Sequence, residues 1–174
     1  MSFFLRLPPL ALAAAFVMQP SAADPKPLPK LAFLEPELEG DLEDSSRVPG
    51  WQRKMAALDA FLRQQLGERK LYTVLSNQPA ADLIERDRAR REVHECLPCI
   101  QDVAQRLDAD RVLVVWVYRE SELVLWLSAR IVDPATGARV VARSMSFRGD
   151  NDRAWNKAAD YFLRQLAEVP AERR

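Results

Sequence analysis

The chain has 174 residues, and its 25 basic side chains balance its 25 acidic ones. A net charge of zero gives no electrostatic basis for binding nucleic acid or an anionic membrane surface. The length suits one domain with a single hydrophobic core.

Residues 1–23 have the pattern of a secretory signal peptide. Arg6 supplies a positive start, Leu10–Val17 is an apolar run, and small residues follow up to Ala23, where cleavage is expected. The run is short for a permanent anchor, although an uncleaved N-terminal anchor is the alternative. No cysteine follows it closely, which disfavours a lipid anchor. We therefore expect a periplasmic protein with no membrane span after cleavage.

Residues 24–30 alternate proline with other residues, which predicts an extended lead-in to a single domain over residues 31–169. Leu31–Leu34 is predicted to be the first strand. The acidic stretch 35–47 is predicted to be a solvated loop. Its carboxylates could bind a hard cation, but they lack the ligand spacing of an EF-hand.

Helix and strand signals alternate through the middle of the chain. Apolar residues at helical spacing predict a helix that begins after Gly50 and ends at Gly67. Leu71–Leu75 is aromatic and β-branched and predicts a second strand. The next helix contains the charged stretch 85–92, which we interpret as a solvated face; a basic docking patch is the alternative. A further helical segment covers residues 96–107.

Three strands and a helix complete the domain. Val112–Val117 is apolar without interruption, which predicts a strand buried on both faces at the centre of the sheet. The last strand, residues 138–147, carries Arg139 and Arg143 and suits a sheet edge. A final helix is expected to begin near Asp150 or Asn151. The order β-α-β-α-β-β-β-α predicts an α+β fold, a mixed sheet of about five strands with helices mainly on one face.

The two cysteines form a C-L-P-C motif at Cys96 and Cys99. In an oxidising compartment this predicts a structural disulfide. A helix start also favours a thiolate, so a redox-active pair is a second interpretation, although Glu95 would raise the thiol pKa. A metal site that uses both cysteines and His94 is the third.

Other catalytic or cofactor patterns are missing from the sequence. His94 is the single histidine, no second cysteine pair completes a zinc tetrad, and five glycines leave little for a phosphate-binding loop. We therefore predict no catalytic residue, no cofactor, no metal ligand and no enzymatic activity.

The junction between the last strand and the last helix, Arg148 to Trp155, is the other unusual stretch. Gly149 permits a tight backbone passage, and Arg148 and Asp152 are placed to form an ion pair across the turn. One interpretation is a junction that serves only the fold. The other is a recognition corner, because a tryptophan beside an arginine resembles an interface anchor. An exposed Trp155 would favour recognition, and a buried one the fold.

Five motifs occur in a fixed order: C-x-x-C, L-D-A-D-R-V, S-x-L-V-L, D-x-x-T-G and R-G-D-N-D-x-x-W. Over about Leu31–Leu166 the chain thereby resembles a bacterial family of small exported proteins of unknown function, whose boxes include C-x-x-C and R-G-N-T-D-E-S-W. The matching residues are Cys96, Cys99, Ala109, Asp110, Ser121, Leu123, Leu125, Asp133, Thr136, Gly137, Arg148, Gly149, Asp152 and Trp155. Departures from the family pattern are Asp108, Arg119, Asp150, Asn151, Arg153 and Ala154.

That family is similar in layout to the N-terminal domain of TolB and to the curli secretion protein CsgG, which act as periplasmic interaction modules. The resemblance implies a non-enzymatic periplasmic accessory or binding module that contacts another periplasmic protein. The expected surface comprises Arg119, Ser121, Arg148, Gly149, Asp152 and Trp155. One alternative is a periplasmic thiol–disulfide or metal-delivery protein that uses the cysteine pair, as an accessory to a quinoprotein alcohol oxidation system. Another is a small-ligand carrier with a pocket between the sheet and the final helix.

Overall fold

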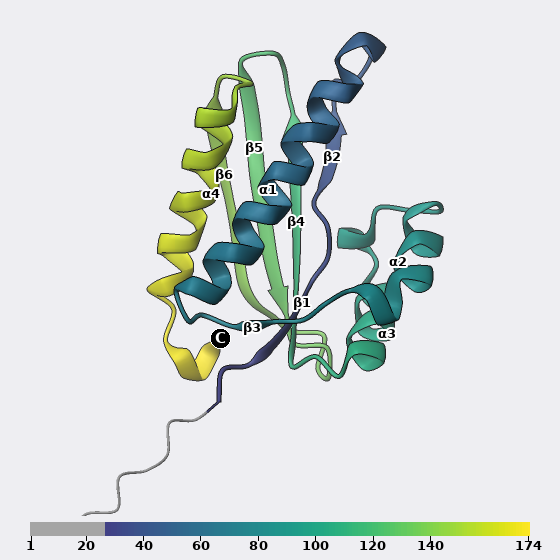
Figure 1. The fold of residues 1–174 in the computed structure, drawn as a ribbon, viewed down its shortest axis with the longest axis vertical. Coiled ribbons are helices and arrows are strands. Elements are labelled where there is room, and N and C mark those ends of the chain that lie inside the picture. Colours follow the sequence, from purple (N-terminus) through teal and green to yellow (C-terminus); the bar gives the residue numbers. More distant parts are fainter. Residues whose placement is uncertain (1–26) are drawn as a thin grey trace, which may run out of the picture.

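A computed structural model describes residues 27–174 (Figure 1). The predicted signal peptide, residues 1–23, and the start of the proline-rich lead-in lie outside the described residues. Within the described part, no helix combines the length and the apolar character that crossing a membrane requires.

Six strands form one mixed sheet in the order β3-β1-β4-β5-β6, with β2 also paired to β4. The strands are β1 Lys30–Phe33, β2 Glu37–Gly40, β3 Thr73–Val74, β4 Arg111–Arg119, β5 Val124–Val132 and β6 Arg139–Arg148. Both β1 and β2 run parallel to β4 and pair with its first and second halves, so they act as one interrupted strand. On the other side of β4, β5 and β6 follow as an antiparallel meander. The strand order ends at β6, which is therefore an edge strand, as predicted.

Helices pack against both faces of the sheet. The α-helices are α1 Val48–Glu68, α2 Ala81–Arg88, α3 Leu97–Leu107 and α4 Asp152–Ala167. The two longer helices, α1 and α4, pack on one face, and α2 and α3 pack on part of the other. Successive residues of β4 point to opposite faces, so its continuous apolar run contributes to both cores. The α+β fold and the central position of β4 are therefore confirmed.

The prediction of a solvated loop over residues 35–47 is wrong for its middle, which forms β2. Leu38 packs against the core of α1 and α4, while Glu37 and Glu39 point to the opposite face. This is a period-2 strand pattern. Its acidic residues and the neighbouring proline concealed it, because both are depleted in strands.

Both ends of the first helix also differ from the prediction, because α1 begins at Val48, before Gly50, and continues past Gly67. Gly67 lies inside α1, which ends at Glu68, and Lys70 adopts the left-handed conformation with φ 52°. Such a residue commonly follows a helix end, although glycine is the usual choice.

Two glycines should respond oppositely to alanine. Gly40 has φ +96°, and an added Cβ would lie 2.2 Å from the carbonyl oxygen of Arg119 on β4. We expect Gly40→Ala to lower the free energy of unfolding by roughly 2–4 kcal/mol. At Gly67, an added Cβ meets nothing within 4 Å. We expect Gly67→Ala to raise the free energy of unfolding by about 0.5 kcal/mol or more. Denaturant unfolding followed by tryptophan fluorescence measures both, and equal effects would contradict the assignment.

Candidate functional site

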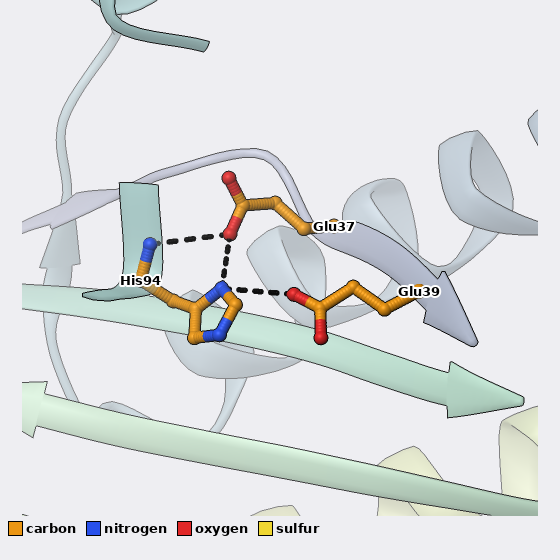
Figure 2. A group of neighbouring side chains, drawn as sticks. All are labelled: Glu37, Glu39 and His94. Atoms are coloured by element: carbon orange, nitrogen blue, oxygen red, sulfur yellow. Dashed lines mark hydrogen bonds and ion pairs between the residues drawn. The ribbon is translucent and has the colours of Figure 1, made fainter. Parts of the chain in front are cut away.

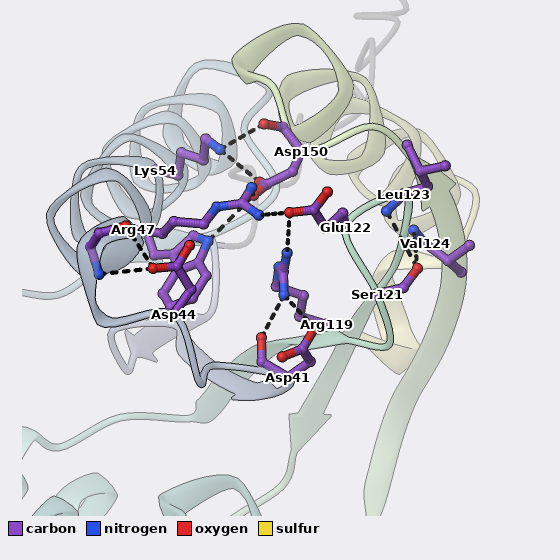
Figure 3. Close-up of polar contacts among 12 residues, drawn as sticks. Asp41, Asp44, Arg47, Lys54, Arg119, Ser121, Glu122, Leu123, Val124 and Asp150 are labelled. Carbon is purple, nitrogen blue, oxygen red and sulfur yellow. Dashed lines mark hydrogen bonds and ion pairs between the residues drawn. The ribbon is translucent and has the colours of Figure 1, made fainter.

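The junction between β6 and α4 is organised by the carboxylate of Asp150, whose side chain is 3% exposed (Figure 3). Its Oδ1 accepts hydrogen bonds from Lys54 Nζ at 2.7 Å and from Trp155 Nε1 at 3.0 Å. Its Oδ2 accepts from Arg47 at 3.1 Å and from Trp51 Nε1 at 3.3 Å. Four donors, from the start of α1 and from α4, therefore converge on one carboxylate.

The protonation of Asp150 follows from these contacts. Burial alone would raise its pKa, but the hydrogen bonds from Lys54 and Trp155 and the charge of Lys54 hold the pKa below its ordinary value. The carboxylate is therefore ionised at neutral pH, and it fastens α4 to α1.

The polar residues around Asp150 complete the turn. Asn151 caps α4, because its side chain accepts the backbone N–H of Ala154 at 3.1 Å, which confirms one of the two predicted caps. Gly149 has φ +91°, and its N–H donates to the carbonyl of Leu123 at 3.0 Å. Asp152 is exposed in the first turn of α4. The ion pairs of the junction are made by Asp150, and the predicted pair between Arg148 and Asp152 does not form among the described residues.

Trp155 is only 2% exposed, and its ring packs edge-to-face on Phe147 at a centroid distance of 5.9 Å. A buried Trp155 is expected of a junction that serves the fold, and an exposed one of a recognition corner. The inner side of the junction therefore serves the fold. A tryptophan and an arginine near a turn look the same in sequence whether they anchor a partner or the protein's own core.

Two other residues of the expected surface also support this end of the sheet (Figure 3). Arg119 is 2% exposed and donates to the carbonyl oxygen and the carboxylate of Asp41, at 2.6 and 2.9 Å. Ser121 is half-buried, and its Oγ accepts the backbone N–H groups of Leu123 and Val124 in the turn between β4 and β5. Neither side chain is presented freely to a partner.

The outer side of the same junction is open. A groove of about 910 Å³ runs between the free edge of β6 and α4. Its lining residues are Met145, Ser146, Phe147, Arg148, Asn151, Arg153, Ala154, Lys157, Ala158 and Tyr161. We call this hollow the β6–α4 groove. Arg148 is the member of the expected surface that lies in it.

The β6–α4 groove combines apolar and cationic groups. Phe147 is half-buried and Tyr161 is 45% exposed. Arg148, Arg153 and Lys157 are exposed, no acidic residue lines the groove, and none of these three cations makes an ion pair with a side chain that the structure describes. The groove therefore presents three unpaired positive charges over an apolar floor.

Part of the sheet face opposite α1 and α4 lies beyond the cover of α2 and α3. It carries Tyr118, 45% exposed, and Trp126, 39% exposed. Trp126 pairs across the sheet with Tyr118 on one side and with Ser146 of β6 on the other. This aromatic row therefore leads to the same free edge as the groove.

The cysteine motif lies on the other side of the molecule, at the start of α3. The sulfur atoms of Cys96 and Cys99 are bonded to each other, and each residue is 6% exposed. Cys96 also caps α3, since its Sγ accepts the N–H of Cys99 at 3.2 Å. These contacts agree with the predicted structural disulfide. They leave no free thiolate for a metal site with His94.

A second polar cluster joins β2 to the short 3-10 helix η3, Val93–Glu95 (Figure 2). His94 Nδ1 lies 2.5 Å from Glu37 Oε2 and 3.3 Å from Glu39 Oε1. The imidazole stacks on Trp116 of β4, with 4.3 Å between ring centroids. Sequence reasoning missed this cluster; the Glu-Leu-Glu alternation of β2 was the signal that could have found it.

The cluster shifts the pKa of each of its members. Burial alone would lower the pKa of His94, but the hydrogen bond to Glu37 and the surrounding carboxylates raise it above its ordinary value. Burial would raise the pKa of Glu37, but hydrogen bonds from His94 and from the N–H of Val93 hold it lower. Burial raises the pKa of Glu39, and the charge of His94 offsets this only in part.

Comparison with known proteins identifies a family but no activity. The model of the DUF3280 family, described as "Protein of unknown function (DUF2380)", matches residues 29–166. No curated protein matches the chain.

Several solved structures are similar to this chain. The NMR structure of E. coli LpoB has 10% identity and a TM-score of 0.50, over 83% of this chain and 82% of that one, and shows a shared fold. Lipoprotein GNA1162 from Neisseria meningitidis has 19% identity and a TM-score of 0.47, covering 81% and 99%. TolB from Acinetobacter baumannii has 13% identity and a TM-score of 0.48, over 86% of this chain and 31% of TolB.

The contacts of Asp150 predict that it stabilises the protein much more than the neighbouring carboxylate of Asp152 does. Asp150→Asn leaves Lys54 and Arg47 without their shared anion, and we expect the free energy of unfolding at pH 7 to fall by roughly 2–4 kcal/mol. Asp152→Asn changes an exposed carboxylate and should cost less than about 1 kcal/mol. Urea unfolding followed by circular dichroism measures both, and similar losses would contradict the role of Asp150.

The effect of Asp150 should also depend on pH. Its pKa is lower in the folded protein, so its contribution is fully present above the unfolded value of about 4 and is lost as the pH falls through the folded value. The difference in unfolding free energy between the unmodified protein and Asp150→Asn should be constant near neutrality and shrink below about pH 4. A difference that stays constant down to about pH 2 would argue against an ionised, paired Asp150.

Proposed function

The chain belongs to the DUF3280 family, and we propose that it is a non-enzymatic accessory module of the periplasm that acts by binding another protein. The observation that carries this proposal is the β6–α4 groove beside the free edge of the sheet. The predicted signal peptide at residues 1–23 supports the periplasmic location.

The free edge of β6 offers a main-chain binding site. A strand at a sheet edge presents unpaired N–H and C=O groups, and an extended segment of a partner can pair with them. With ten residues, β6 is the longest strand of the sheet. Its arginines deter pairing with a neutral or basic edge, and they favour a segment that brings negative charge.

The two faces of the sheet at that edge would contact different side chains of such a segment. Residues of an added strand alternate between the faces of the sheet. Those on one face would meet Phe147 and Tyr161 in the groove, with the cations of Arg153 and Lys157 beside them. Those on the other face would lie beyond Ser146 and the exposed row that includes Trp126. The partner segment we propose is therefore extended, acidic and partly apolar.

This proposal keeps the location expected from the sequence but changes its chemistry. Arg148 lines the groove, and Gly149 and Asp152 follow closely after Arg148 in the sequence. Trp155 packs on the inner side of the junction, whereas Arg119 contacts Asp41 and Ser121 contacts the turn between β4 and β5. Interaction is therefore assigned to the outer side of the junction, and support to the inner side.

Site-specific crosslinking tests the proposal. A photo-crosslinking residue replaces Ser146, which is exposed on β6, or Arg90, which is exposed beyond α2. In the periplasm of the source cells we expect a discrete crosslinked product from position 146 and none from position 90. The double change Arg153→Glu and Lys157→Glu should lower the yield of the crosslinked product from position 146 roughly tenfold. This is equivalent to about 1.4 kcal/mol of binding free energy.

Arg90→Glu provides the matched control, because it reverses an exposed positive charge on another part of the molecule. It should leave the product at position 146 unchanged. The proposal fails if position 146 gives no product, or if Arg90→Glu lowers the yield as much as the two changes in the groove.

A thiol–disulfide exchange function makes a different prediction. Exchange requires access to a sulfur atom, whereas Cys96 and Cys99 are each 6% exposed. We expect replacement of both cysteines by serine to lower the free energy of unfolding by about 2 kcal/mol, as for a short crosslinked loop, and to leave the crosslink at Ser146 intact. Loss of that crosslink from a folded double variant would favour the exchange function instead.

A further inference from the structure

We propose that Glu37, Glu39 and His94 form a binding site for a divalent transition-metal ion. Among such ions, Zn²⁺ fits these ligands best. The three residues come from two segments, and each offers one ligand atom (Figure 2). This site is separate from the β6–α4 groove, and the inference does not rest on the function proposed above.

The fold brings the three ligand atoms together. Glu37 and Glu39 are two residues apart on β2, so their side chains lie on the same face of the sheet. His94 reaches them from η3, and all three ligand atoms lie within 4.8 Å of one another. Both carboxylates converge on the same nitrogen, Nδ1, at 2.5 and 3.3 Å.

The hydrogen bonds of the cluster leave one acceptor without a donor. A ring nitrogen carries at most one hydrogen, and Glu37 is the carboxylate at hydrogen-bonding distance from Nδ1. The Oε1 atom of Glu39 is buried, faces the same nitrogen and has no hydrogen-bond partner. A buried polar atom without a partner costs free energy. A cation between the three residues would supply the missing partner.

The ligands are held in place before any ion binds. The carboxylate of Glu37 accepts the backbone N–H groups of Val93 at 2.7 Å and His94 at 3.1 Å. The side chain of His94 is 4% exposed, and its ring is stacked on Trp116. Such fixed ligands lose little conformational freedom on binding, which favours affinity.

A suitable outer partner for the histidine is also present. A metal-bound imidazole donates its other N–H group to a carboxylate or carbonyl group. His94 Nε2 lies 3.5 Å from Glu95 Oε1, and that carboxylate lies 3.4 Å from the guanidinium of Arg130. Coordination through Nδ1 would place the hydrogen on Nε2, where Glu95 can accept it.

The ligand set indicates which ions fit. One imidazole nitrogen with two carboxylate oxygens suits Zn²⁺, Co²⁺ or Mn²⁺, whereas Mg²⁺ and Ca²⁺ prefer oxygen ligands alone. Bound there, the ion would link β2 to the segment that leads into α3. Because such a site is complete only in the folded chain, binding should also stabilise the protein.

Metal titration of the purified mature protein tests the inference, after chelator treatment and removal of any affinity tag. We expect one equivalent of Zn²⁺ to bind in calorimetry, and the melting temperature to rise with added Zn²⁺. Glu39→Gln should weaken Zn²⁺ binding at least tenfold. Glu43→Gln changes an exposed glutamate of the following loop and should leave binding unchanged.

The single histidine of the chain provides an independent measurement. Its two imidazole ¹⁵N resonances report which nitrogen binds the ion, and we expect Zn²⁺ to shift the Nδ1 resonance. This readout uses the unmodified protein, so it decides the matter even if Glu39→Gln does not fold. A dissociation constant above about 1 mM, equal binding by the two variants, or a shift of Nε2 in place of Nδ1 would overturn the inference.

Discussion

The central strand β4 must be covered on both faces and paired along both edges, and the other elements meet those requirements. Its apolar residues alternate between the core of α1 and α4 and the core of α2 and α3. One edge takes β1 and then β2 in parallel; the other takes β5. The pairing with β2 sets Glu37 opposite Trp116, and the β5–β6 meander ends at an unpaired edge. Both candidate sites thus follow from the neighbours of a single strand.

The sequence predicted those features whose cause is local. The apolar run of Val112–Val117 is enough to indicate a central strand, and an asparagine before a helix is enough to indicate its cap at Asn151. Features made by distant partners were missed. Glu37 resembles a solvated acid until His94, 57 positions later, comes to lie beside it. Asp150 similarly depends on Lys54, 96 positions earlier.

The junction between β6 and α4 shows how one short sequence can have two separate roles. On its inner side, Trp155 and Asp150 are buried and hold α4 against α1. On its outer side, Arg148 is exposed beside a groove. Interface anchors and core anchors use the same residue types, so composition cannot separate them. Burial separates them, and in this junction it sets Asp150 and Trp155 apart from Arg148.

The parallel pairing of β1 with β4 also fixes how far the Arg148 end of β6 lies from the point where the described chain enters the sheet. Lys30 enters the sheet beside the first residue of β4, whereas Arg148 lies near the end that Arg119 occupies. The nine residues of β4 make eight steps of about 3.3 Å, so the two ends lie roughly 26 Å apart. A partner bound at the Arg148 end of the β6–α4 groove would therefore lie about one strand length from the point where Lys30 enters the sheet.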